Sequence, residues 1–131
     1  MVGFKCHILD ETHRVVEGQE RAAGKALAKV AFEIRKAAIA SIVESPEPSR
    51  PGRPPHTRRG LARRAIMYSV DRKAQRAVIG PEASIIGDAM RAHEFGGDFR
   101  GQTYPQRPFM GPALERNVGL LPTGFAGEVH S

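Results

Sequence analysis

The sequence predicts an α+β fold, in which a small, mostly antiparallel sheet packs on one long N-terminal helix with two or three short helices. Three observations lead to this prediction. Apolar residues recur at helical spacing between about residues 12 and 43. Apolar and polar residues alternate with the period of a strand over residues 2–8 and 66–70. Proline and glycine divide the rest of the chain into shorter segments, so the other helices are expected to be short.

The first two elements are a strand over residues 2–8 and the long helix over about residues 12–43. The strand places its apolar residues on one face: Val2, Phe4, Cys6 and Ile8. The helix carries an apolar stripe: Val16, Ala23, Leu27, Val30, Ala31, Ile34, Ala38 and Ile42. Its many alanines between residues 22 and 40 allow a close neighbour. That neighbour is either the sheet of the same chain or, in part, an adjacent subunit.

A proline-rich segment follows the long helix. Five prolines make residues 45–57 an extended and mobile loop by prediction, because proline supplies no N–H and blocks both helix and central strand. Thr57 is then expected to cap a short helix that ends near residue 65. Two stretches, 66–70 and 75–79, flank a turn at Asp71, so they are expected to pair as a β-hairpin.

The second half of the chain is expected to hold smaller elements. These are a helix over residues 83–95, a short edge strand over 107–110 and a terminal helix over 112–118. Residues 1–118 are therefore predicted to form a single domain. Residues 119–131 show no periodicity and are predicted to form a loose tail.

The composition excludes several classes of protein. The 131 residues suffice for one domain with a mostly aliphatic core, since aromatic residues make up only 6 %. The single Cys6 allows no internal disulfide, as is usual in a reducing cytosol. No apolar run approaches the ~20 residues of a membrane span, and no signal-peptide pattern opens the chain. We therefore expect a protein that does not enter a membrane and is not exported by itself.

A dense basic run lies between residues 50 and 76, where Asp71 is the only acidic residue. Its members are Arg50, Arg53, Arg58, Arg59, Arg63, Arg64, Arg72, Lys73 and Arg76. Together with the net charge of +6, this run favours a polyanionic neighbour such as DNA or an acidic protein surface. The alternative is a solvated surface with no ligand. No aromatic residues are interleaved to stack on bases, so any DNA contact is expected to be non-specific and sensitive to salt.

Enzyme chemistry finds little support in the sequence. His93-Glu94 begins like a zinc-protease motif, but Gly97 stands where the second histidine is required. The histidines are scattered over the chain, at positions 7, 13, 56, 93 and 130. Cys6 falls on the apolar strand face and is expected in the core. We therefore expect no catalytic residue, no metal site, no cofactor and no enzymatic activity.

Two linked stretches stand out, His93-Glu94-Phe95-Gly96-Gly97 and, after a polar loop, residues 104–116. The two glycines can end a helix in a left-handed cap. The second stretch contains Arg107, Pro108, Phe109 and Pro112, and the last of these suits the first turn of a helix. Phe95 and Phe109 are expected in one core. Glu94 and Arg107 are expected to form an ion pair that closes the loop between them.

The order Glu-Phe-Gly-Gly, polar loop, Arg-Pro-Phe-Met-Gly-Pro-Ala-Leu resembles the hallmark of the tail-completion proteins of tailed bacteriophages. This family is also described as virion morphogenesis, minor tail or head–tail joining proteins. A weaker match lies upstream, in Pro51-Gly52-Arg53-Pro54-Pro55-His56-Thr57 and Gly60-Leu61-Ala62-Arg63-Arg64-Ala65-Ile66. It departs from the family pattern at Ala62, where the family often has Leu, and at Ala65, where it often has Ser. The matches span roughly residues 51–116.

The resemblance implies a structural virion protein that forms a ring in the neck, completes the tail and joins it to the filled head. A hexamer is the first expectation and a dodecamer the second. Its implied partners are neighbouring connector, tail-tube or terminator proteins, and double-stranded DNA in the channel. The candidate DNA-facing residues are Arg53, Arg58, Arg59, Arg63 and Arg64.

The implied location is the virion, with assembly in the host cytoplasm. Two alternatives remain within the neck, a tail terminator and a head-closure stopper. The alternative from another class is a small basic cytosolic protein that binds nucleic acid.

Overall fold

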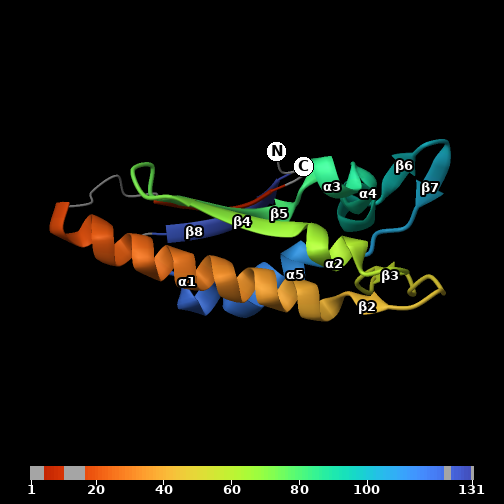
Figure 1. Ribbon diagram of the computed structural model, residues 1–131, viewed down its shortest axis with the longest axis horizontal. Coiled ribbons are helices and arrows are strands. Elements are labelled where there is room, and N and C mark those ends of the chain that lie inside the picture. The colour runs from red at the N-terminus through yellow and green to blue at the C-terminus, as the bar shows by residue number, and fades with distance from the viewer. Residues whose placement is uncertain (1–4, 11–16, 123–124, 131) are drawn as a thin grey trace.

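The structure, a computed structural model, describes residues 5–10, 17–122 and 125–130. It has an α+β architecture, as the sequence predicts (Figure 1). In chain order the described elements are β1 (Lys5–Asp10), α1 (Glu17–Ser41), β2 (Val43–Glu44), β3 (His56–Thr57), α2 (Leu61–Ala65), β4 (Ile66–Asp71), β5 (Arg76–Pro81), α3 (Ala83–Ile86), α4 (Ala89–Phe95), β6 (Gly97–Phe99), β7 (Gln102–Tyr104), α5 (Met110–Asn117), the 3₁₀ turn η1 (Val118–Leu120) and β8 (Phe125–His130).

Four of the strands form an antiparallel sheet in the order β4-β5-β1-β8. The predicted hairpin is confirmed: β4 and β5 pair from Ile66 opposite Pro81 to Asp71 opposite Arg76. Its turn is held by Asp71, whose Oδ1 accepts a hydrogen bond from Ala74 N at 3.0 Å. β1 lies at the centre, with Cys6 opposite both Ile79 of β5 and Val129 of β8. The predicted Val2 and Phe4 lie outside the described residues.

The long helix packs along one face of the sheet, where it contacts β4, β5 and α5 (Figure 1). The predicted stripe is confirmed over its described part, because Leu27, Ile34 and Ala38 are fully buried. Lys25, Lys29 and Lys36 are exposed on the opposite side. The core also includes Cys6, Ile8, Ile66, Ala77, Ile79, Phe109, Met110 and Ala113. The helical spacing of the apolar residues therefore predicted the buried face of α1 correctly. Residues 12–16, which the prediction also included, lie outside the described residues.

The tail prediction is wrong for residues 125–130. These residues form β8, which pairs with β1 along its whole length, from Phe125 opposite Asp10 to His130 opposite Lys5. Pairing satisfies backbone N–H and C=O groups that a loose tail would leave to water. The segment is therefore an edge strand of the main sheet.

Two other predicted elements differ in the structure. The helix expected over residues 83–95 is divided into α3 and α4 at Gly87, whose φ of 68° and ψ of −154° suit only glycine. The edge strand expected over residues 107–110 does not form. A short hairpin of β6 and β7 lies before this segment, and α5 already begins at Met110. Pro112 lies in the first turn of α5, as predicted.

The proline-rich loop is anchored at both ends. β2 and β3 pair in parallel, and Ser45 N donates to Thr57 O at 2.9 Å. The predicted N-cap at Thr57 is wrong, because α2 begins only at Leu61 and Gly60 stands at its N-cap position. Thr57 Oγ1 still accepts a hydrogen bond from Ala62 N at 3.4 Å. None of the helices in the described part of the chain has the length and hydrophobicity to cross a membrane.

Candidate functional site

Glu94, on the last turn of α4, is buried at 4 % exposure. Its Oε2 accepts hydrogen bonds from the backbone N–H groups of Phe109, at 2.7 Å, and Met110, at 2.9 Å. Its Oε1 accepts from Gly111 N at 2.9 Å. These donors are at the start of α5, where a helix has no acceptors of its own and its dipole favours a negative charge. Glu94 therefore caps α5 from a distant point in the sequence.

The predicted ion pair between Glu94 and Arg107 is wrong, because the two side chains have different partners. The carboxylate is engaged by the three backbone donors of α5. Arg107 Nε donates instead to Ser49 O at 3.0 Å, and Arg107 N donates to His93 O at 2.5 Å. The Glu94 carboxylate thus accepts charge-assisted hydrogen bonds from backbone N–H groups rather than from a guanidinium group.

Gly96 ends α4 as predicted, but its φ of 72° and ψ of 177° differ from the predicted left-handed cap. Gly97, with φ of 111°, already begins β6. Gly96 also permits a close approach of the returning chain. A Cβ at Gly96 would lie 3.3 Å from Gln106 N and 3.4 Å from Tyr104 O. A side chain at this position would therefore crowd the backbone of the returning chain, and its φ of 72° also favours glycine.

Only one of the two hallmark aromatics is in the core. Phe109 is fully buried, as predicted, and Pro108 beside it is half-buried. The prediction for Phe95 is wrong: its side chain is 39 % exposed, because α4 turns Ala92 and Glu94 inward instead. Phe95 lines an open cavity of about 850 Å³ together with Phe99.

Two hydrogen bonds join the proline-rich loop to the loop before α5. Arg107 Nε reaches Ser49 O across 58 positions of sequence. Gly52 N donates to Gln106 O at 2.8 Å. The proline-rich loop and the loop before α5 are therefore one structural unit, although the sequence separates them widely.

The candidate arginines do not form a single surface. Arg59, Arg63 and Arg64 line a cavity of about 360 Å³, which we call the arginine cavity. Arg35 of α1 also lines it, and Glu44 is the acidic residue among its lining residues. Within the described chain Arg63 Nε is buried and has no hydrogen-bond partner. The cavity thus places four guanidinium groups against one carboxylate, which suits an anionic ligand.

Arg35 was missed by sequence reasoning, and Arg53 and Arg58 lie apart from the arginine cavity. Arg35 sits on the long helix, 24 positions before Arg59, and its Nε donates to Ile66 O at 2.7 Å. Nothing in the helical pattern distinguishes it from other solvent-side cations. Arg58 lines two neighbouring cavities, and Arg53 is exposed on the proline-rich loop.

His93 lies between the hallmark and the proline-rich loop. Burial, followed by the positive charge of Arg107, lowers the pKa of His93 below its usual value. The ring packs edge-on against Tyr104 with centroids 5.4 Å apart. Its Nδ1 is buried, and no described residue supplies a hydrogen-bond partner for it. Burial and Arg107 therefore make the His93 imidazole harder to protonate than a free one.

Cys6 belongs to the core, as predicted, and is fully buried. Burial, with a smaller contribution from the Glu94 charge, raises the pKa of the Cys6 thiol to about 12. Such a thiol is inert near neutral pH. A search of the described residues for three or more His, Cys, Asp or Glu side chains that could hold a metal ion found none.

Comparisons of the chain with protein-family models, with curated proteins and with solved structures found no match.

Proposed function

We propose that this chain is a structural protein of a tailed-phage neck, which forms a ring at the head–tail junction and completes the tail for joining. The observation that carries this proposal is where the residues of the family-like motif make their contacts. Glu94 holds the start of α5, and Arg107 holds the proline-rich loop at Ser49. The hallmark residues thus act on the shape of the chain, which is the role that a structural protein requires of them.

Exposed apolar side chains supply contact surface for neighbouring subunits. Val118 and Leu120, beside the end of α5, are 53 % and 55 % exposed. The others are Phe32, Val43, Leu61, Met67, Tyr68, Ile85 and Phe95. Single exposed apolar residues are ordinary, but neighbours such as Val118 and Leu120 favour burial against a partner. A hexameric ring is the first expectation and a dodecamer the second.

The arginine cavity supports a place beside DNA in such a ring. Its guanidinium groups fit the phosphate backbone of DNA in the channel, without reading the base sequence. The same ring would meet connector and tail-tube or terminator proteins at its two faces. A tail terminator or a head-closure stopper is a variant of the same proposal.

The test is assembly. Native mass spectrometry and negative-stain electron microscopy at moderate salt, with and without tail tube, should reveal a ring. The double variant Val118→Asp/Leu120→Asp should reduce ring formation and leave the melting temperature unchanged, because both side chains lie outside the core. A matched control adds two charges at exposed polar positions, Ser84→Asp and Gln102→Asp. A strict monomer under both conditions would overturn the proposal.

The arginine cavity also favours a second candidate, a small basic protein that binds nucleic acid. The same measurements separate the two. A monomer or dimer that binds duplex DNA with strong salt dependence supports this candidate, whereas a discrete ring supports the neck protein.

A further inference from the structure

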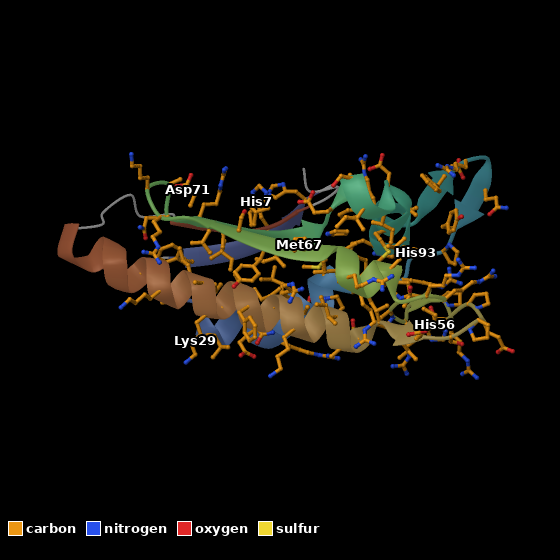
Figure 2. The ribbon with its side chains drawn as sticks, viewed as in Figure 1. His7, Lys29, His56, Met67, Asp71 and His93 are labelled. Carbon is orange, nitrogen blue, oxygen red and sulfur yellow. The ribbon has the colours of Figure 1, made fainter. Side chains whose placement is uncertain are left out.

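A second polar cavity lies where the proline-rich loop meets the hallmark, and we call it the junction pocket. Its volume is about 310 Å³, and the lining side chains used below are Glu47, Ser49, His56, Arg58, His93 and Arg107. Figure 2 shows His56 and His93 at the same end of the molecule, far from Asp71 of the β4–β5 turn. The pocket is thus built from segments that only the fold brings together.

The fold leaves polar atoms unpaired in this pocket. Ser49 is only 7 % exposed, and its Oγ has no hydrogen-bond partner within the described chain. The same holds for Nδ1 of His93. A buried polar group without a partner is costly, and native proteins rarely keep one without a ligand, a water molecule or a role. Two such groups in one pocket indicate that it receives a polar ligand.

The lining charges define the sign of that ligand. Arg58 and Arg107 contribute two guanidinium groups, and Glu47 contributes the opposing carboxylate. Hydrogen bonds hold parts of this lining in place: Arg107 Nε donates to Ser49 O at 3.0 Å, and His56 Nδ1 lies 2.7 Å from Glu47 O. With Nδ1 as the donor to that carbonyl, Nε2 of His56 becomes a donor when the ring is protonated. The pocket therefore suits an anion.

We propose that the junction pocket binds a tetrahedral oxyanion, namely a phosphate group. Its potential donors come from separate parts of the chain, namely β3 and the segments beside it, α4 and the loop before α5. A planar carboxylate is satisfied by two donors in one plane, as in its pairing with a single arginine. A phosphate group accepts in several directions and uses more of these donors.

The test is a titration of the isolated chain with inorganic phosphate at fixed pH, followed by NMR of the His56 and His93 ring signals. We expect saturable shifts with a dissociation constant on the order of millimolar or below. The pKa of His93 is measured separately in sulfate, whose charge is constant between pH 5 and 8. An anion opposite the ring should raise the pKa of His93, which burial and the charge of Arg107 lower in the free protein.

A pair of adjacent arginines provides the matched control. Arg58→Gln removes an exposed cation that lines the junction pocket and should weaken phosphate binding roughly tenfold. Arg59→Gln removes the same charge from the arginine cavity. It should leave unchanged the phosphate affinity that is measured from the His93 ring signals. Equal losses in both variants would show an effect of net charge alone and would overturn the proposal. Absence of saturable shifts would overturn it as well.

Two further variants test the lining without unfolding the chain. Ser49→Ala removes a buried hydroxyl that makes no hydrogen bond with a described residue, so the free protein should be at least as stable as before, while phosphate affinity falls roughly threefold. Glu47→Gln should increase the affinity. Unchanged affinity in both would mean that phosphate does not enter the pocket.

A competition arm distinguishes the source of the phosphate group. If short duplex DNA displaces inorganic phosphate from the His93-reported site, the natural ligand is a backbone phosphate. If it does not, the ligand is a free phosphate group or a small phosphate ester. Either result is consistent with a phosphate site in the junction pocket, and neither depends on the assembly of a phage neck.

Discussion

Glu94 illustrates how a single residue can be recognised as important while its partner is misjudged. An acid at the end of a helix and an arginine after the following loop, each beside an aromatic residue, suggested an ion pair. The structure supplies instead three backbone donors at the start of α5. A helix N-terminus and a guanidinium offer a carboxylate similar help, namely several N–H groups and positive charge. The sequence places both a helix start and an arginine shortly after Glu94, and only the three-dimensional path of the chain decides which of them the carboxylate contacts.

Replacing Glu94 by glutamine should lower the free energy of unfolding by about 2–4 kcal/mol. The amide loses the charge and turns a donor group toward N–H groups that need an acceptor. Chemical denaturation measures the loss. Glu115→Gln, on the exposed side of α5, is the control and should change stability by less than about 0.5 kcal/mol. Equal stability of the two variants would show that the cap contributes nothing.

The Cys6 thiol should make stability fall at high pH. Its pKa is raised to about 12 in the folded chain from a usual value of 9.0. The unfolded chain therefore loses this proton first as pH rises, so the stabilisation is complete below pH 9 and is lost between about 9 and 12. The slope attributable to Cys6 approaches about 1.4 kcal/mol per pH unit. Urea denaturation of the wild type and of Cys6→Ala isolates it, because other groups affect both chains. If the free energy of unfolding depended on pH in the same way in both chains, the raised pKa of Cys6 would be refuted.

At the scale of elements, β8 is the main departure from expectation. Its alternation is weak because Gly127 stands at an inward position between Phe125 and Val129. That glycine is required by packing rather than by a turn. A Cβ on it would lie 2.7 Å from Leu114 Cδ1 of α5. The glycine that hides the strand pattern is therefore what allows the strand to lie against the helix.

Gly127→Ala should destabilise the chain by about 1–3 kcal/mol, because Leu114 is nearly buried and has little room to move. Thermal unfolding measures the loss. The same substitution made in a Leu114→Ala background should cost much less, since the clashing methyl group is gone. Gly119→Ala is the matched control, because nothing lies within 4 Å of a Cβ there. A cost that does not depend on Leu114 would contradict the packing of β8 on α5.

Removing residues 119–131 is expected to unfold the protein rather than to trim a loose tail. The deletion exposes the edge of β1 and the inward faces of α5 and the sheet. Circular dichroism after truncation provides the measurement. Retention of a cooperative transition at the original temperature would show that β8 is dispensable.

At the scale of the whole molecule, the elongated shape separates two basic ends (Figure 1). The proline-rich loop and the arginine cavity lie toward one end, and the β4–β5 turn with Arg72, Lys73 and Arg76 lies toward the other. A DNA channel would face one of them. Total charge alone therefore does not tell which end would contact DNA in the proposed ring.

Neutralising one end at a time distinguishes them. The triple variant Arg53→Gln/Arg59→Gln/Arg64→Gln changes exposed side chains, so we expect an unchanged melting temperature. It should weaken duplex DNA binding and flatten its dependence on salt concentration, because fewer counterions are released. Arg72→Gln/Lys73→Gln/Arg76→Gln removes the same charge at the other end and should have the smaller effect. Fluorescence anisotropy over a salt series measures both. The reverse order would move the DNA contact to the hairpin end.

The sequence by itself determined the fold class, the buried face of the long helix, the β4–β5 hairpin and the end of α4 at Gly96. Each follows from short-range rules, because an element must bury one face and glycine permits the backbone conformation that ends it. Tertiary structure alone decided that Glu94 holds α5, that Arg107 holds Ser49, that Arg35 joins Arg63, and that residues 125–130 complete the sheet. These contacts join groups far apart in the chain. Their donors and acceptors are backbone atoms, one carboxylate and common surface cations, and nothing in the sequence distinguishes these groups from others of their kind.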